Sequence, residues 1–155
     1  MKNKSFIKSM RCALNGFIYA LKNEDNLRFD ISVLFTVVFF ALFYGISRTN
    51  AAIISAVSAM TVGAELFNTA IERAVDTAVS EYNPLAKAAK DVSAAAVLVC
   101  AVGAVISGAV IFGNFRKIHA ALLKIFQNPL YAAAFIILIT IDTVLILKKR
   151  KSKSK

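Results

Sequence analysis

Residues 61–91 read TVGAELFNTAIERAVDTAVSEYNPLAKAAKD, a polar segment inside an otherwise apolar chain. If this segment is an α-helix with about 100° per residue, Glu65, Asn68, Glu72 and Asp76 fall within roughly 80° of one another. We call these four residues the polar stripe. A carboxylate inside a bilayer costs several kcal/mol unless partners compensate it, so it marks a functional site by default.

The composition is typical of a helical membrane protein. The chain has 155 residues, of which 58% are hydrophobic, with no Trp and two Pro, and its mean hydropathy is +0.65. These values are too apolar for a soluble domain of this length. The basic N-terminal stretch lacks the uninterrupted apolar core of a cleavable signal peptide, so we expect none. The predicted fold class is an all-α integral membrane helical bundle.

The net charge of +10 at pH 7 does not indicate nucleic-acid binding, because the basic residues are not interleaved with stacking aromatics on a soluble face. They gather instead near the two ends of the chain, in residues 2–28 and 148–155. Positive residues beside membrane spans stay in the cytoplasm. We therefore expect a multi-pass protein with both termini in the cytoplasm.

Apolar segments divide the chain into a membrane core at residues 1–113 and an added region at residues 114–155. An amphipathic surface helix is expected at residues 5–22, since its apolar and basic residues separate onto two faces. The polar run at residues 22–30 is expected to form a turn. Crossings of a hydrocarbon layer about 30 Å thick are expected at about 30–47, 51–72, 93–113 and 130–147, the last followed by a basic cytoplasmic tail.

Two Asn-Pro pairs, at residues 83–84 and 128–129, predict helix starts. Asn is a favoured N-cap, and Pro at the first helical position loses no hydrogen bond. The second pair begins the fourth crossing, which the charges also require, because two cytoplasmic termini need an even number of crossings. Before it, the apolar spacing of residues 115–125 predicts an external amphipathic helix that carries His119 on its surface.

The polar segment has the groups needed to hold a nucleotide and a divalent cation. Carboxylate oxygens are good ligands for Mg²⁺, and a cation such as Lys90 can contact a phosphate. A glutamate beside a lipid hydroxyl can accept its proton. Phosphoryl transfer to a membrane alcohol fits both features. The chain has no GxxxxGK[ST] loop and no kinase GxGxxG or HRD motif, so its nucleotide site must be of another kind.

The run GAELFNTAIERAVDTAVSEYNPLAKAAKD resembles the signature of the small bacterial membrane lipid kinases, the prokaryotic diacylglycerol kinase and undecaprenol kinase family. That signature is approximately E-x-x-N-[ST]-A-I-E-x-x-V-D, followed by S/P-E-Y and A-K-D. The resemblance extends upstream to Asn23, Glu24 and Arg28 and covers about residues 5–113. It implies a location in the bacterial cell membrane, a surface helix, three crossings, and a homotrimer with active sites between subunits at the cytoplasmic interface.

The resemblance also implies roles for the matched residues, with ATP as co-substrate and Mg²⁺ as cofactor. Glu65 matches the catalytic base beside the acceptor hydroxyl, and Glu24 and Glu72 match the metal ligands. The matched nucleotide-binding positions are Glu24, Glu72, Asp76, Glu81, Tyr82, Asn83, Lys90 and Asp91. The matched positions around the lipid substrate are Glu65, Asn68, Arg28 and Ala94.

The expected function is ATP- and Mg²⁺-dependent phosphorylation of a lipid alcohol, undecaprenol in preference to diacylglycerol. Ala94 stands where diacylglycerol-type members often carry Ser, and residues 83–91 look closer to the undecaprenol branch. Two alternatives stay open: a small proton-coupled transporter that uses Glu65, and a non-catalytic membrane scaffold. Asp142, in the fourth crossing, is expected either to have a packing or snorkelling role or to pack its span against the bundle by pairing with a cation.

Overall fold

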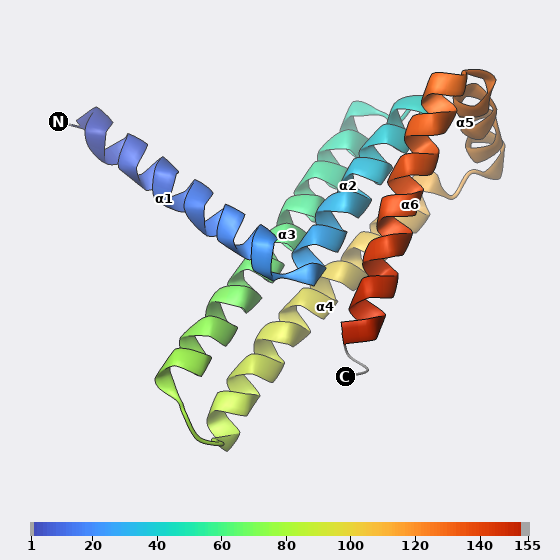
Figure 1. Ribbon diagram of the computed structural model, residues 1–155. Coiled ribbons are helices and arrows are strands. Elements are labelled where there is room, and N and C mark those ends of the chain that lie inside the picture. Colours follow the sequence, from blue (N-terminus) through green and yellow to red (C-terminus); the bar gives the residue numbers. More distant parts are fainter. Residues whose placement is uncertain (1, 153–155) are drawn as a thin grey trace.

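The computed structural model describes residues 2–152, with side chains for residues 6–148, so the basic side chains at residues 2–5 and 149–155 lie outside the description. All regular structure in the described residues is α-helical, which confirms the predicted class. The helices are α1 (Lys2–Asn23), α2 (Asp25–Tyr44), α3 (Arg48–Ala78), α4 (Pro84–Phe112), α5 (Phe115–Gln127) and α6 (Pro129–Ser152) (Figure 1).

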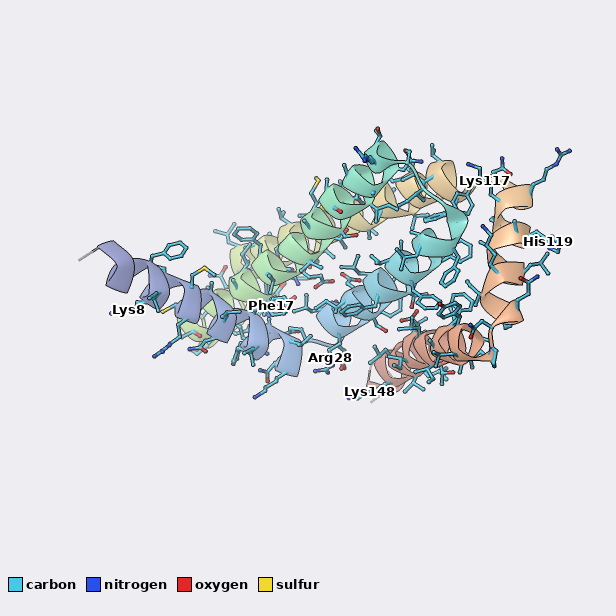
Figure 2. All side chains as sticks on the ribbon, turned by 90° about the horizontal axis from the view of Figure 1, so that it is seen from above. Lys8, Phe17, Arg28, Lys117, His119 and Lys148 are labelled. Carbon is cyan, nitrogen blue, oxygen red and sulfur yellow. The ribbon has the colours of Figure 1, made fainter. Side chains whose placement is uncertain are left out.

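Four helices, α2, α3, α4 and α6, are long and apolar enough to cross a membrane. Figure 1 shows α3 and α4 as a long hairpin, with α2 beside it and α6 next to α2, while α1 extends away from the bundle. α5 is the expected amphipathic helix, and its His119 is exposed (Figure 2). At 1.5 Å per residue, α3 is about 46 Å long and α2 about 30 Å. The α3–α4 hairpin therefore projects past the start of α2 (Figure 1).

Asparagine side chains fix both helix starts that the Asn-Pro pairs predict. Asn83 Oδ1 accepts hydrogen bonds from the backbone N–H groups of Leu85 and Ala86, at 2.8 and 3.2 Å. Asn128 Oδ1 accepts a bond from the N–H group of Leu130 at 2.9 Å. These bonds satisfy N–H groups that have no partner within the helix. The predicted starts of α4 and α6 are confirmed.

The junction of α1 and α2 differs from the expected turn over residues 22–30. Only Glu24 leaves the helical backbone, with φ −112° and ψ 114°, and α2 begins at Asp25. Arg28 accounts for this sharp elbow, because its guanidinium donates to two carbonyl oxygens at the end of α1, at 2.9 and 2.7 Å, and pairs with Asp25. The carbonyl groups that end α1 thus find partners, and the Asp25 carboxylate complements the positive N-terminus of α2.

A carboxylate with two hydroxyl partners fastens α6 to α2. The Asp142 carboxylate accepts hydrogen bonds from two hydroxyls of α2. Ser32 donates to Oδ1, and Thr36 donates to Oδ2 at 2.8 Å. The expectation that Asp142 holds its span on the bundle is confirmed, but the expected cation partner is wrong for the described part of the chain. Two hydroxyls one turn apart on α2 serve the two carboxylate oxygens instead. Stacked rings of Phe39 and Phe135, with centroids 6.0 Å apart, extend the same interface.

Asp142→Ala removes the acceptor of both hydroxyls, so it should lower the free energy of unfolding by about 1 kcal/mol, given about 0.6 kcal/mol for each hydrogen bond between membrane helices. Asp142→Asn keeps one acceptor oxygen and should lose about half as much. Thermal unfolding in detergent, followed by circular dichroism, measures both. Thr140→Ala is the control, because that hydroxyl bonds within α6, to the carbonyl of Ile136. An alanine variant at position 142 as stable as this control would contradict the fastening role.

Candidate functional site

Burial falls along the polar stripe of α3 from Glu65 to Asp76. Glu65 and Asn68 are buried, at 4% and 8% exposure, whereas Glu72 is half-buried and Asp76 is exposed. Asp76, the exposed member, lies in the last turn of α3, on the hairpin end that projects past α2 (Figure 1). The stripe therefore links the apolar interior of the bundle to its polar end.

α4 completes the hydrogen bonds of the buried part of the stripe. The hydroxyl of Ser93, itself buried, donates to Asn68 Oδ1 at 2.7 Å, and Asn68 Nδ2 donates to Glu72 Oε1 at 3.1 Å. The Thr69 hydroxyl donates to the carbonyl oxygen of Glu65 at 2.9 Å. Buried polar groups cost free energy unless they are paired. These bonds let α3 carry polar side chains among apolar helices.

Two ion pairs hold the more exposed acids of the site. Lys90 Nζ on α4 lies 2.7 Å from Asp76 Oδ1, and the Arg73 guanidinium on α3 lies 3.1 Å from Glu24 Oε1 at the elbow. The same guanidinium lies 5.9 Å from the centre of the Tyr19 ring on α1. Because the Arg73 and Asp76 side chains are 53% and 59% exposed, solvent screens these pairs. An incoming charged ligand can therefore separate them at small cost.

The carboxylates of Glu24 and Glu72 fit a magnesium ion by their chemistry. Glu24 pairs with Arg73, the residue after Glu72 on α3, while Glu72 accepts a hydrogen bond from Asn68. Mg²⁺ in phosphate-binding sites takes one or two carboxylates and completes its shell with phosphate oxygens and water. Residues 6–148 contain no group of three or more His, Cys, Asp or Glu side chains that could hold a metal. A cation here would depend on oxygens that its ligand brings.

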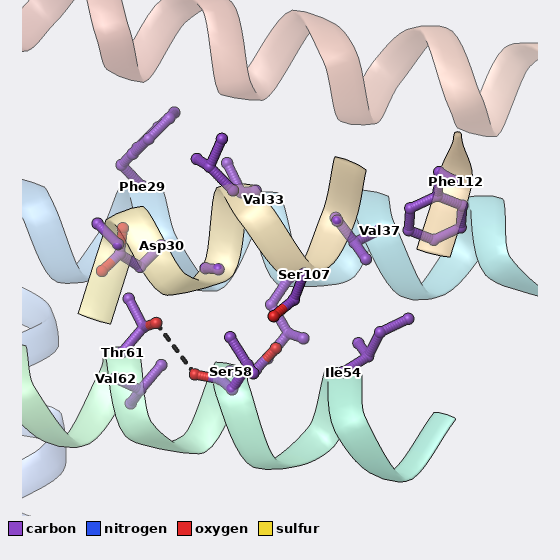
Figure 3. Close-up of a pocket in the computed structure, with 16 residues that line it drawn as sticks. Phe29, Asp30, Val33, Val37, Ile54, Ser58, Thr61, Val62, Ser107 and Phe112 are labelled. Carbon is purple, nitrogen blue, oxygen red and sulfur yellow. Dashed lines mark hydrogen bonds between the residues drawn. The ribbon is translucent and has the colours of Figure 1, made fainter. Parts of the chain in front are cut away.

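An apolar groove of about 430 Å³ runs between α2, α3 and α4 (Figure 3). Its walls are mainly aliphatic, with Asp30 and Thr61 at one end and Phe112 at the other. Thr61 lies one turn before Glu65 on the same face of α3, so the groove leads toward the buried carboxylate. An apolar alcohol in the groove and an anion at the polar end would thus meet at the stripe.

The predicted site residues do not all lie in this cluster. Arg28 belongs to the α1–α2 elbow (Figure 2), and Asn83 caps α4. Four other predicted residues are exposed on α4 or on the connection before it: Glu81, Tyr82, Asp91 and Ala94. Among the other predicted residues, Lys90 contacts the stripe through Asp76, and Glu24 contacts Arg73, which neighbours the stripe on α3. The hydrogen bonds and ion pairs of the site thus concentrate where α3 meets α4 and the elbow.

Three residues that the sequence patterns did not indicate also lie at the site. Arg73 bonds to a predicted metal ligand, and its position one residue after Glu72 was the available signal. Ser93 follows Lys90 by three residues, so both lie on the face of α4 that meets α3. Asp30 lines the groove from α2, although nothing in its spacing distinguished it from an interfacial charge.

Residues 11–112 match the family model described as prokaryotic diacylglycerol kinase. The chain is 35% identical over 105 residues to a diacylglycerol kinase of Synechocystis sp., and 36% identical over 107 residues to an undecaprenol kinase of Bacillus subtilis. It is 32% identical over 93 residues to a diacylglycerol kinase of Pseudomonas aeruginosa. These matches cover 67%, 69% and 60% of this chain, and 60%, 87% and 76% of the respective relatives.

The match with the Synechocystis protein thus spans less than two thirds of that relative, whereas the Bacillus protein is matched over most of its length. α5 and α6 lie beyond the residues that the family model covers. The comparison with solved structures found no match.

Asn83→Ala removes the oxygen that accepts two N–H bonds at the start of α4, so the free energy of unfolding should fall by about 1 kcal/mol. Asn83→Asp keeps an accepting oxygen and should unfold near the wild-type temperature. Thermal denaturation in detergent without added ligand measures both variants. Equal stability of the alanine variant and the wild type would contradict the capping role.

Proposed function

This chain belongs to the prokaryotic diacylglycerol kinase family, and we propose that it is a lipid kinase that transfers the γ-phosphoryl group of ATP to the hydroxyl of a membrane lipid alcohol. The observation that carries the proposal is the position of Glu65, buried on α3 between the apolar groove and the exposed acids of the stripe. A lipid in the groove presents its hydroxyl from one side, and a nucleotide approaches from the other.

Glu65 is the proposed general base. Its carboxylate accepts the proton of the lipid hydroxyl while the hydroxyl oxygen forms a bond to the γ-phosphorus of ATP. The bond between that phosphorus and the bridging oxygen to the β-phosphate breaks, and ADP leaves. Burial of Glu65 limits the access of water, which would compete as acceptor. Orientation of the two substrates then supplies much of the rate.

The polar end of the stripe is the proposed nucleotide site. Glu24 and Glu72 would hold Mg²⁺ with the help of phosphate oxygens, and the ion would supply positive charge that neutralises the transferred group. Lys90 exchanges Asp76 for a phosphate oxygen, a change that the exposure of this ion pair supports. The remaining nucleotide contacts come from the resemblance, and they are Glu81, Tyr82, Asn83 and Asp91.

Undecaprenol is the acceptor that we favour, with diacylglycerol as the alternative. The undecaprenol kinase of Bacillus subtilis is matched over 87% of its length, against 60% and 76% for the two diacylglycerol kinases. Ala94 has no hydroxyl to offer to a glycerol headgroup. The aliphatic walls of the groove are compatible with an isoprenoid chain. The identity of 35% to a diacylglycerol kinase is the reason to test both lipids.

The proposed setting is the bacterial cell membrane, with a homotrimer as the active form and both termini in the cytoplasm. The start of α2 and the end of α6 lie at the same end of the bundle (Figure 1), as an even number of crossings requires. The exposed acids of the stripe lie toward that end, where cytoplasmic ATP would reach them.

Purified protein in mixed micelles should transfer labelled phosphate from ATP to undecaprenol faster than to diacylglycerol offered side by side. Glu65→Gln keeps the shape of the side chain but removes the base, so turnover should fall by about 10²- to 10⁴-fold while ATP affinity stays near the wild-type value. Glu24→Gln and Glu72→Gln should each raise the Mg²⁺ concentration needed for half-maximal rate. Asp142→Asn, which changes a carboxylate of α6, is the control that should retain turnover.

Failure of the intact protein to phosphorylate either lipid would contradict the kinase proposal. Proton uptake without ATP consumption would favour the transporter alternative. Faster transfer to diacylglycerol would overturn the choice of acceptor alone. Strong residual turnover of Glu65→Gln would overturn the assignment of the base.

A further inference from the structure

We propose that Ser93 is a positioning residue that orients the Glu72 carboxylate for a divalent cation, acting through Asn68. The inference rests on the proposed function, since it takes Glu72 as a ligand of that cation. Ser93 itself touches neither substrate nor metal in this account. Its effect passes through two hydrogen bonds, from the Ser93 hydroxyl to Asn68 Oδ1 at 2.7 Å and from Asn68 Nδ2 to Glu72 Oε1 at 3.1 Å.

The chemistry of the three side chains fixes the direction of both bonds. An ionised carboxylate only accepts hydrogen bonds, so the amide atom that faces Glu72 must be the donor Nδ2. Asn68 Oδ1 therefore faces Ser93, and a hydroxyl is the donor found there. The opposite amide orientation would set Oδ1 against the carboxylate, with two acceptors facing each other. The Glu72 carboxylate therefore fixes which way round the Asn68 amide lies, and the Ser93 hydroxyl stabilises that orientation by donating to Asn68 Oδ1.

Burial gives this relay its rigidity. Ser93 and Asn68 are 6% and 8% exposed, so water does not readily replace either partner. The Ser93 hydroxyl also lies 2.8 Å from the carbonyl oxygen of Lys90, one turn back in α4, so its single hydrogen is shared between two acceptors. Asn68 and Glu72 lie one turn apart on α3, so an amide held in this orientation restrains one carboxylate oxygen and leaves the second for a ligand.

The position of the serine in α4 is what makes the relay possible. Ser93 faces α3, whereas the neighbouring Ala94 is exposed. A hydroxyl one residue later would point away from Asn68 by about 100° around the helix. Partners that orient a metal ligand typically change metal affinity by about 10- to 100-fold when they are removed. Loss of the Ser93 hydroxyl should therefore be visible in cation binding, before any catalytic step.

The test measures Mn²⁺ binding to the full-length protein in detergent, with adenylyl imidodiphosphate present and free Mn²⁺ followed by electron paramagnetic resonance. Carboxylate and phosphate oxygens bind Mn²⁺ much as they bind Mg²⁺. Ser93→Ala should weaken Mn²⁺ binding about 10-fold, and Ser93→Thr, which keeps a hydroxyl, should restore most of it. Ser55→Ala is the matched control, because that exposed serine bonds within α3, to the carbonyl of Ala51. If Ser93→Ala does not fold, Ser93→Cys supplies a poorer donor of similar size with the same expected direction.

A double-mutant cycle separates positioning from a general loss of structure. If Ser93 acts through Asn68, then Ser93→Ala should add no further loss of Mn²⁺ affinity in an Asn68→Ala protein. Wild-type Mn²⁺ affinity of Ser93→Ala, or a full further loss in the Asn68→Ala background, would overturn the inference. These outcomes are independent of the kinase assay. Absence of phosphoryl transfer by the wild type overturns the proposed function, whereas turnover with unaltered Mn²⁺ binding of Ser93→Ala overturns the role of Ser93 alone.

Discussion

Polar side chains on one face of α3 can lie beside apolar helices only because the neighbouring helices complete their hydrogen bonds. Ser93 reaches Asn68 from α4, and Arg73 on α3 reaches Glu24 at the elbow. Aliphatic faces rich in Ala and Val tolerate sliding, whereas a hydrogen bond fails within a fraction of an ångström. The polar contacts therefore set the register of α3 against α4, and the same bonds that remove the cost of burial also shape the site.

Local chemistry in the sequence was enough to predict the helical framework. Asn83 and Asn128 identify helix starts because capping involves residues two or three positions apart, which the sequence itself displays. The shared face of Glu65, Asn68, Glu72 and Asp76 on α3 likewise depends only on helical spacing along one segment. Features of this kind need no knowledge of which helices become neighbours.

Contacts between distant segments could not be predicted in the same way. The partners of Asp142 are hydroxyls more than 100 residues away, and the sequence, which left a packing role and a cation partner both open, did not identify them. Ser93 resembled any small residue of a membrane helix until its contact with Asn68 was known. The turn expected at residues 22–30 is limited to Glu24 in the structure, because the Arg28 guanidinium bonds to carbonyl oxygens at the end of α1.

α5 and α6 follow the last residue that the family model matches, and they join the bundle mainly through the outer side of α2. Neither helix interrupts the order of α1 to α4. The helices that the family model leaves unmatched therefore cover a different side of α2 from the α3–α4 hairpin, so the polar contacts among α3, α4 and the elbow do not depend on them.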